Sequence, residues 1–241
     1  MKPLKRFHRA MLSLGEEIVE RLKKHYSVEA REYVSLFAYL RSRDPYEVLI
    51  ATILSQNTTD KAALQALERL EEKVGLTPST ISKARRKSIE AAIRVAGMYR
   101  SKARFLQETS RIIMSEYGGS MRNLLLGDPG SVRERIKGLP GVGDKTADVL
   151  LTTTGILQTV PIDTHVGRVA ERLGLVRRGA SYGEARASLE AVFREEHRHL
   201  AHLLLIAHGR RVCKARKPLC DDCPLTDLCK YYAEARGAKT A

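Results

Sequence analysis

The sequence predicts an all-α protein, and three observations support this fold class. Apolar residues recur at helical spacing through most of the 241 residues, while the alternating pattern of strands is almost absent. Starts typical of helices recur, as in Asp44-Pro45, where proline takes the first helical position. Glycines such as Gly75 and Gly174 close apolar segments, as they do at helix ends. We therefore expect short helices joined by tight turns.

The apolar periodicity places these helices in order along the chain. A first helical region covers residues 8–42, with a break before Tyr33. The expected helices that follow cover residues 45–55, 61–74, 85–96, 102–117, 145–154, 164–173, 182–193 and 200–208, with two shorter ones after Thr77 and Asp128. The chain from Cys213 onward is expected to be loop-like. No long Gly/Ser linker and no repeat of solenoid length divides the chain.

The charge of the chain predicts an anionic partner. Lys and Arg number 42 against 28 Asp and Glu, which gives a net charge of +14 at pH 7. Nucleic acid is the leading candidate, and a highly charged surface from a hot or salty habitat is the alternative. No apolar run approaches the ~18 residues needed to span a bilayer, and the start of the chain lacks the apolar region of a signal peptide. We expect an intracellular protein that does not engage a membrane.

One stretch combines a glycine hairpin with a lysine and leads the functional prediction. Leu139 to Ala147 has an apolar entry, Gly141 and Gly143, and a helix that begins at once with Lys145. Glycines let backbone N–H groups approach a phosphate, and a helix N-terminus adds partial positive charge. Lys145 could act there as a nucleophile, because this environment disfavours its ammonium form. A phosphate-binding lysine and an ordinary tight turn are the alternatives, and Asp163 further on is expected to cap the next helix.

The four cysteines lie within one short stretch and predict a single local metal site. Their order is Cys213-x6-Cys220-x2-Cys223-x5-Cys229. Zinc sites usually show two close pairs of ligands, and here only Cys220 and Cys223 form one. Disulfides are not expected in an intracellular chain. The histidines between residues 197 and 208 form no helical i, i+4 pair, so they are assigned to the surface or to DNA rather than to a second metal.

Together these features resemble the endonuclease III branch of the helix-hairpin-helix DNA glycosylase superfamily. The resemblance rests on the hairpin, on Lys145 and Asp163, and on the cysteine spacing, and it extends over most of the chain. It implies two helical domains that flank a DNA cleft. One is a six-helix barrel with the helix-hairpin-helix, expected at residues 42–157. The other holds a [4Fe–4S] cluster and is expected to combine residues 1–41 with residues 158–241.

The resemblance also implies a reaction. The residue matching Lys145 attacks the deoxyribose C1′ of a damaged nucleotide, the base leaves, and β-elimination from a Schiff base cuts the strand on the 3′ side. Asp163 would face Lys145 across the mouth of the cleft, take its proton and stabilise positive charge on the sugar. The implied protein is a bifunctional DNA glycosylase and AP lyase for oxidised pyrimidines in duplex DNA. The alternatives are a monofunctional mismatch or adenine glycosylase, whose relatives lack this lysine, and a non-catalytic iron–sulfur DNA-binding protein.

The lesion base must leave the stack before Lys145 can reach the sugar, so the resemblance implies residues that fill the gap. The polar run at residues 55–60 supplies one of them. Its alignment places Asn57 at the position usually held by glutamine, so Gln56 and Asn57 remain alternatives, as does a plain capping loop. Met98 is the expected apolar wedge, with surface packing as its alternative. The remaining expected DNA contacts are Leu139, Gly141, Val142, Gly143, Thr146, His165, Lys214, Arg216 and Lys217.

The same resemblance assigns the four cysteines to a [4Fe–4S] cluster, with zinc as the alternative. Four thiolates leave no iron open, so we expect a structural role in which the cluster shapes the basic loop Lys214-Ala215-Arg216-Lys217 for phosphate contact. An ordinary solvated loop is the alternative. We expect a monomer that binds double-stranded DNA with a damaged base or an abasic site, in the cytoplasm and associated with the nucleoid if the source is prokaryotic.

Overall fold

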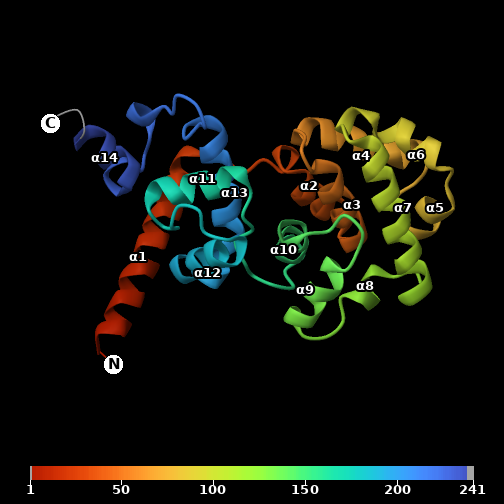
Figure 1. Cartoon of the computed structure of the whole chain (residues 1–241), viewed down its shortest axis with the longest axis horizontal. Coiled ribbons are helices and arrows are strands. Elements are labelled where there is room, and N and C mark those ends of the chain that lie inside the picture. Colours follow the sequence, from red (N-terminus) through yellow and green to blue (C-terminus); the bar gives the residue numbers. More distant parts are fainter. Residues whose placement is uncertain (1, 238–241) are drawn as a thin grey trace. The chain divides into compact units, whose positions relative to one another are not determined.

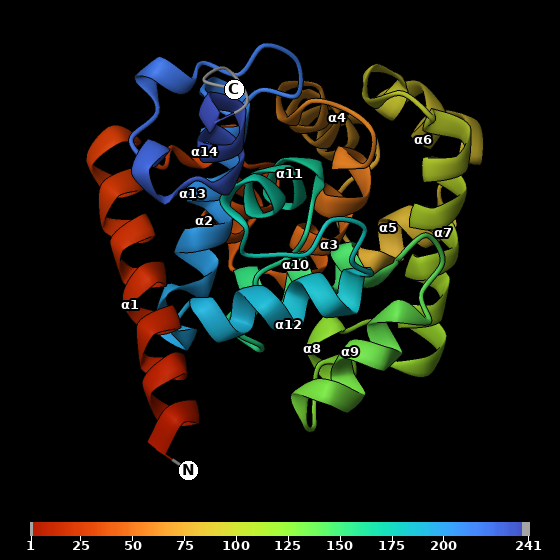
Figure 2. The same cartoon turned by 60° about the vertical axis from the view of Figure 1, so that its left-hand side comes forward.

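The all-α prediction is confirmed by the structure, a computed structural model that describes residues 2–237. Side chains are described from residue 9 to residue 235. Every regular element within these residues is a helix (Figure 1, Figure 2). No helix in this part of the chain is both long and apolar enough to cross a membrane.

The chain divides into two compact units. One unit combines residues 1–28 with residues 158–241, and the other covers residues 29–157. The sequence predicted the first boundary after residue 41, but in the structure it follows residue 28. The reason is α2 (Val34–Ser42), whose buried Val34 and Ala38 belong to the core of the second unit. The second boundary, after residue 157, agrees with the expectation.

The unit of residues 29–157 is built around α3 (Pro45–Ser55). The Asp44 carboxylate accepts a hydrogen bond from the Tyr46 N–H and caps this helix, which is buried from Pro45 to Leu54. A helix that is apolar all round needs neighbours on every side. The helices that contact α3 are α2, α4 (Asp60–Lys73), α7 (Tyr99–Glu116), α8 (Met121–Leu124) and α10 (Asp144–Thr153). The other elements of this unit are η1 (Ala30–Glu32), α5 (Pro78–Lys83), α6 (Arg86–Ile93), η2 (Arg94–Ala96) and α9 (Pro129–Lys137).

The other unit packs the long N-terminal helix α1 (Lys2–His25) against helices from the second half of the chain. Helix α1 contacts α12 (Tyr182–Val192) and α13 (Arg198–Arg211), and its position beside α12 can be followed in Figure 2. Helix α13 also contacts α11 (Thr164–Leu173). Because residues 201–209 of α13 are all buried, this helix forms the centre of the unit.

Of two further expectations from the sequence, one is confirmed and the other needs correction. The break expected before Tyr33 is confirmed, since α1 ends at His25 and η1 separates it from α2. The tail expected to be loop-like contains short helical turns and a final helix. The turns of the tail are η4 (Cys220–Asp222) and η5 (Thr226–Leu228), and the final helix is α14 (Lys230–Gly237). One further turn, η3 (Glu195–His197), lies earlier, directly before α13. Helix α14 packs against α11, a tertiary contact that local sequence patterns do not report.

Candidate nucleic-acid interface and iron–sulfur site

The segment between α9 and α10 is folded as a helix-hairpin-helix. The Asp128 carboxylate caps α9 by accepting hydrogen bonds from the N–H groups of Gly130 and Ser131. In the hairpin, Leu139 and Val142 are buried, and the Val142 N–H donates to the Leu139 carbonyl over 3.1 Å. These two apolar side chains anchor the turn in the core and thereby fix the course of its backbone.

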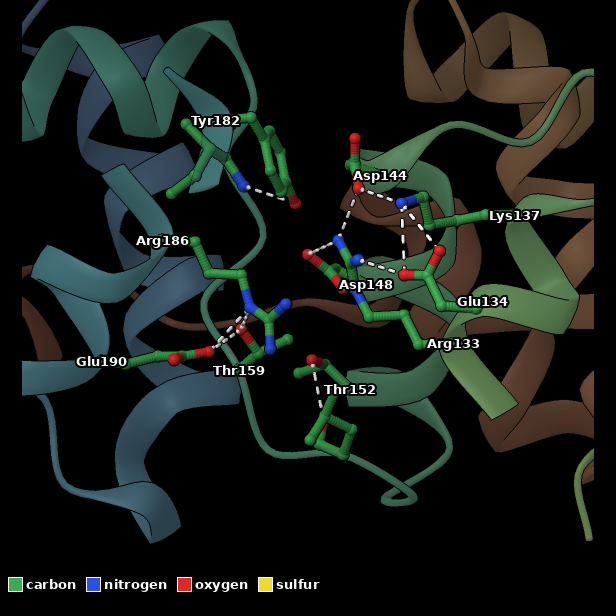
Figure 3. Close-up of polar contacts among 12 residues, drawn as sticks. Arg133, Glu134, Lys137, Asp144, Asp148, Thr152, Thr159, Tyr182, Arg186 and Glu190 are labelled. Carbon is green, nitrogen blue, oxygen red and sulfur yellow. Dashed lines mark hydrogen bonds and ion pairs between the residues drawn. The ribbon is translucent and has the colours of Figure 1, made fainter. Parts of the chain in front are cut away.

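An ion-pair network joins the two helices of this motif (Figure 3). The Arg133 guanidinium on α9 donates to both carboxylate oxygens of Asp148 on α10, over 2.6 and 3.2 Å, and to Asp144 over 2.8 Å. Lys137 lies 3.0 Å from the same Asp144 oxygen. Asp148 is completely buried, so its charge needs such a partner. The network holds α9 and α10 at a fixed spacing on either side of the hairpin.

Gly141 and Gly143 are glycines for different reasons. Gly141 has a φ of +78°, and a Cβ there would lie 2.5 Å from Cγ of Phe105, so its backbone and its packing both require glycine. Gly143 has an extended backbone with a φ of −101°, which any residue can adopt, and a Cβ there would meet nothing within 4 Å. The open space at Gly143 therefore serves no internal contact and admits the close approach of a ligand.

The first turn of α10 combines a bare helix N-terminus with a lysine. Gly143 is the N-cap, and no side-chain hydrogen bond caps the helix. The N–H groups of this turn thus keep their partial positive charge available to an anion. Lys145 is half-buried in the same turn and has no hydrogen-bond or ion-pair partner among the side chains that the structure describes. An amine without an internal partner therefore lies beside a helix N-terminus that no side chain caps.

Gln56 is tied to the hairpin. Its Nε2 donates to the Gly141 carbonyl over 2.8 Å and to Oγ1 of Thr146 over 3.2 Å. Thr146 is itself buried. Both residues are expected DNA contacts, and the structure gives their side chains an internal role, because they join the polar run at residues 55–60 to the hairpin.

Asn57 and Met98 meet at the surface of this unit. Both have left-handed backbone conformations, with φ values of 52° and 45°, which are uncommon outside glycine. Both side chains are exposed, Met98 to 56%, and Nδ2 of Asn57 lies 3.5 Å from Sδ of Met98. Residues held in such conformations cluster at functional sites. The two loops expected to fill a gap in DNA thus bring a polar and an apolar side chain together.

Asp163 is the N-cap of α11, as expected from the sequence. Its Oδ1 accepts hydrogen bonds from the N–H groups of His165 over 2.9 Å and Val166 over 2.7 Å. Its Oδ2 has no partner among the described residues. Capping therefore fixes the carboxylate in place and leaves its second oxygen without a hydrogen bond from the described residues.

The segment before Asp163 is hydrogen-bonded to α12 and α13 through Gln158 and Thr159. Arg186 on α12 donates to Oγ1 of Thr159 over 2.8 Å, a contact visible in Figure 3. Arg198 at the start of α13 donates to the Gln158 carbonyl over 2.9 Å. These contacts order the segment immediately before the cap, so the position of the carboxylate is set from both sides.

His165, another expected DNA contact, is half-buried on α11. Its Nδ1 lies 3.1 Å from the Arg168 guanidinium, and burial lowers the pKa of the ring. The same arginine donates to the carbonyls of Gly209 over 2.8 Å and Cys213 over 2.9 Å. Arg168 therefore fastens α11 to the end of α13 and to the first cysteine.

The four cysteines line one cavity. None of them forms a disulfide, and Cys213, Cys220, Cys223 and Cys229 surround this cavity together with apolar side chains and His208. Within residues 9–235 no group of three or more potential ligands is arranged to hold a single metal ion. Burial raises the pKa of the Cys223 thiol to about 11 and also raises the pKa values of the Cys220 and Cys229 thiols, so their thiolates need a compensating cation. This donor set fits a cluster of several irons, for which four thiolates are the usual ligands.

Polar groups from three elements face the sulfur atoms. The Arg172 guanidinium on α11 donates to Sγ of Cys213 over 3.3 Å. Nε2 of His208 on α13 lies 3.6 Å from Sγ of Cys223. The N–H of Leu225, the residue before η5, donates to the same sulfur over 3.4 Å. Hydrogen bonds of this kind orient and stabilise thiolate ligands.

The basic loop inside the cysteine segment presents its charges to solvent. Lys214, Arg216 and Lys217, all expected phosphate contacts, are exposed. The Arg172 guanidinium donates to the carbonyls of Lys214 over 2.8 Å and Ala215 over 3.2 Å. The loop backbone is therefore held by α11 while its cationic side chains remain at the surface.

Lys102 is a buried residue that the sequence interpretation did not single out. Only 1% of it is exposed, and burial lowers its pKa to about 8. Its Nζ donates to the carbonyls of Leu54 and Ala96, each over 2.8 Å. Its place on the apolar face of α7 could have indicated burial from the sequence. A lysine stem can, however, also run along an apolar surface to solvent, so this signal is ambiguous.

Two family models match the chain. One is described as the HhH-GPD superfamily base excision DNA repair protein and matches residues 50–195. The other is described as the iron–sulfur binding domain of endonuclease III and matches residues 213–229, from the first cysteine to the last. Endonuclease III of Sulfolobus acidocaldarius is 38% identical over 224 residues, which cover 92% of this chain and 98% of the relative. The chain belongs to the endonuclease III family.

Other endonuclease III proteins agree with this assignment. Those of Thermotoga maritima and Escherichia coli K12 are 37% and 34% identical over 204 and 192 residues. These matches cover 84% and 80% of this endonuclease III family member, and 91% and 86% of the relatives. The predicted family and its [4Fe–4S] cofactor are thereby confirmed.

Solved structures share the fold of this endonuclease III family member. A trapped endonuclease III–DNA covalent intermediate, an estranged-adenine complex, matches with a TM-score of 0.77 and 30% identity and covers 92% of this chain and 98% of its own. A non-covalent endonuclease III–DNA complex matches with the same TM-score and identity and covers 92% and 96%. A thermostable thymine-DNA glycosylase, at 22% identity and a TM-score of 0.71, has the same fold. DNA is accordingly the expected binding partner.

Proposed function

We propose that this protein is a bifunctional DNA glycosylase and AP lyase that acts as a monomer on oxidised pyrimidines and abasic sites in duplex DNA. Its family and the DNA complexes of its structural neighbours support base excision as the activity. The lyase part of the proposal rests on the environment of Lys145. Its half-buried amine has no internal partner among the described residues and lies beside the open N-terminus of α10.

Lys145 is the nucleophile of the proposed reaction. Its neutral amine attacks C1′ of the damaged nucleotide, and the bond from C1′ to the base breaks with its electron pair going to the base. The base takes up a proton and leaves, and the sugar ring opens as the Schiff base forms between Nζ and C1′. Removal of a proton from C2′ then drives β-elimination, which breaks the bond from C3′ to the 3′ phosphate. Hydrolysis of the Schiff base releases Lys145.

Asp163 is the proposed base. Since Oδ1 is occupied by the cap of α11, Oδ2 is the oxygen that takes up a proton during the reaction. The carboxylate also stabilises the positive charge that develops on the sugar as the base departs. Asparagine caps helices about as well as aspartate does, so Asp163→Asn separates the two roles of this residue.

Two groups of residues hold DNA phosphates in this proposal. The N–H groups of the first turn of α10 bind one phosphate at the open side of Gly143. Lys214, Arg216 and Lys217 bind the backbone through their charges. Contacts of both kinds position a duplex without reading its sequence.

Asn57 is the proposed residue that fills the gap left by the extruded nucleotide, and Met98 is the wedge. The hydrogen bonds from Gln56 to Gly141 and Thr146 favour this choice, because they engage the Gln56 side chain inside the protein. Asn57 is exposed beside Met98.

Cys213, Cys220, Cys223 and Cys229 are the proposed ligands of the [4Fe–4S] cluster. When bound, the cluster crosslinks the four thiolates and thereby fixes the segment that carries the basic loop. The Arg172 side chain on α11 contacts both Cys213 and the Lys214 carbonyl. It therefore ties the position of the loop to that of the first cysteine.

Borohydride trapping on a duplex with an abasic site tests the proposed lyase. The wild-type protein should form a covalent adduct, Lys145→Gln should form none, and Lys73→Gln, which changes an exposed lysine on α4, should be trapped like the wild type. Asp163→Asn should lose base release while it still binds DNA. Base release without any adduct would instead indicate a monofunctional glycosylase, and an adduct that survives Lys145→Gln would contradict the assignment of the nucleophile. A panel of duplexes, each with one lesion, defines the substrate.

A further inference from the structure

Lys102 binds the chain segments from which the loops with Asn57 and Met98 begin. It lies in the first turn of α7, and its ammonium is enclosed in the protein with 1% of the residue exposed. Nζ donates to the Leu54 carbonyl and to the Ala96 carbonyl, each over 2.8 Å. One cation thus joins two chain segments that are far apart in the sequence.

Each of these carbonyls lies where a helix ends and a loop begins. Leu54 is in the last turn of α3, two residues before Gln56 and three before Asn57. Ala96 ends η2, directly before Gly97 and Met98. Carbonyls in the last turn of a helix have no partner within the helix. They become the attachment points of the loops that follow.

The neighbouring carbonyls of α3 are satisfied locally. The Thr52 carbonyl accepts from Oγ of Ser55, the Ile53 carbonyl from the Gln56 N–H, and the Ser55 carbonyl from the Thr58 N–H. The Leu54 carbonyl is instead bound by Lys102. A cation also interacts favourably with the negative end of a helix dipole, so the ammonium suits this place.

Lys102 is linked to Met98 through the backbone as well. The Lys102 N–H donates to the Met98 carbonyl over 3.0 Å, the first hydrogen bond of α7. Met98 and Asn57 both have positive φ values and touch through Nδ2 and Sδ. Conformations of this kind persist only where the surroundings impose them, and Lys102 contacts the base of each loop.

We propose that Lys102 is a positioning residue, whose ammonium sets the spacing of the Asn57 and Met98 loops and so controls extrusion of the damaged nucleotide. This inference rests on the proposed function. Without the ammonium, two buried carbonyls lose their donor, and the loops must shift to find water. The chemical step at Lys145 does not depend on this spacing once the nucleotide is outside the stack.

The test compares Lys102→Met with Gln107→Met. Gln107 is buried on the same helix and donates to the Ala84 carbonyl over 2.8 Å, at the join of α5 and α6 rather than at the two loops. Both variants exchange a buried donor for an apolar side chain of similar length. Thermal unfolding measures the stability lost in each variant. An effect on activity that comes only from lower stability should therefore appear in both.

Two substrates separate extrusion from chemistry. One is a duplex with thymine glycol opposite adenine, and the other has thymine glycol opposite a tetrahydrofuran residue, where no base pair must be broken. Lys102→Met should slow base release from the first by about 100-fold, the effect of a misplacement near 1 Å, and should slow it much less on the second. Gln107→Met should behave like the wild type on both. The fluorescence of 2-aminopurine next to the lesion should report the lost unstacking with Lys102→Met.

Combination with loop variants adds a second readout. In a protein with Asn57→Ala and Met98→Ala, Lys102→Met should cause little further loss, because its effect passes through those side chains. Lys102→Gln, which retains an N–H donor, replaces Lys102→Met in every assay if the latter does not fold. Equal losses on the two substrates, or a loss matched by Gln107→Met, would overturn the inference. Failure of the proposed function looks different, since the wild type itself would then give neither base release nor a borohydride adduct.

Discussion

Arg133 on α9 and Asp148 on α10 form an ion pair in which the carboxylate is completely buried and the guanidinium donates to both of its oxygens. This pair joins the two helices of the helix-hairpin-helix. Arg133 also donates to Asp144 in the first turn of α10. The geometry of the proposed phosphate site therefore depends on a fully buried carboxylate and on the guanidinium that binds it.

Removal of Arg133 should strongly destabilise the protein. Arg133→Met leaves the Asp148 carboxylate buried without its guanidinium, and breaking a buried pair in this way costs about 3–5 kcal/mol. Urea unfolding at pH 7 measures the loss. The control is Arg177→Met, which breaks an exposed pair with Glu184 and should cost at most about 1 kcal/mol. Similar losses for both variants would show that burial of Asp148 does not matter.

Asp144 should make part of the stability dependent on acid. Its hydrogen bond from Lys137, and then that from Arg133, hold its pKa below the ordinary value of 3.8. A carboxyl group with a lowered folded-state pKa stabilises the protein fully above its unfolded-state pKa and loses that contribution as the pH falls through its folded-state pKa. The difference in unfolding free energy between wild type and Asp144→Asn should be present at neutral pH and shrink below pH 3.8. A difference that does not change with pH would contradict the shift.

Alanine should affect stability at one hairpin glycine and DNA binding at the other. Gly141→Ala forces a side chain to a φ of +78° and into Phe105, which should cost about 1–3 kcal/mol of stability. Gly143→Ala should change stability by less than about 0.5 kcal/mol, since a Cβ there meets nothing. It should instead weaken binding to duplex DNA by about fivefold, equivalent to one hydrogen bond of roughly 1 kcal/mol. Unfolding and DNA titration of both variants decide the matter, and unchanged DNA affinity of Gly143→Ala would exclude a phosphate at this point.

Gln56 and Asn57 should likewise separate stability from activity. Gln56→Ala removes the hydrogen bonds to Gly141 and Thr146 and should cost about 1–2 kcal/mol. Asn57→Ala removes only an exposed side chain and should leave stability within about 0.5 kcal/mol of the wild type. Base release from a paired lesion should nevertheless fall with Asn57→Ala, because the gap is then unfilled. If Gln56→Ala retains wild-type stability and Asn57→Ala retains wild-type base release, the roles of the two residues are reversed.

Loss of one cluster ligand should unfold the cysteine segment. Cys220→Ser should abolish the brown colour of the protein, lower its iron content and lower its melting temperature, because the remaining thiols cannot hold the cluster. Removal of iron from the wild type by oxidation and chelation should produce the same changes. Visible absorbance and iron analysis measure the first effect, and thermal unfolding the second. A colourless native protein that contains zinc would contradict the cluster.

The residues with a local or chemical signal could be predicted from the sequence. Asp163 is recognisable as a cap because it lies immediately before an amphipathic helix, and the structure confirms the cap through His165 and Val166. The cysteine spacing and Lys145 next to a glycine hairpin have equally local signals. Helix α14 and the early unit boundary had none, because both depend on packing against other helices.

The sequence alone was therefore enough to predict most of the helices, several of their caps, the hairpin with Lys145 and a metal site at the four cysteines. Each depends on residues within a few positions of one another, where spacing and backbone preference decide the outcome. The tertiary structure alone decided that Gln56 is bound to the hairpin 85 residues away and that Lys102 holds the end of α3 across 48 residues. A side chain has no pattern in the sequence for a partner at that distance, because burial and hydrogen bonding are properties of the folded chain.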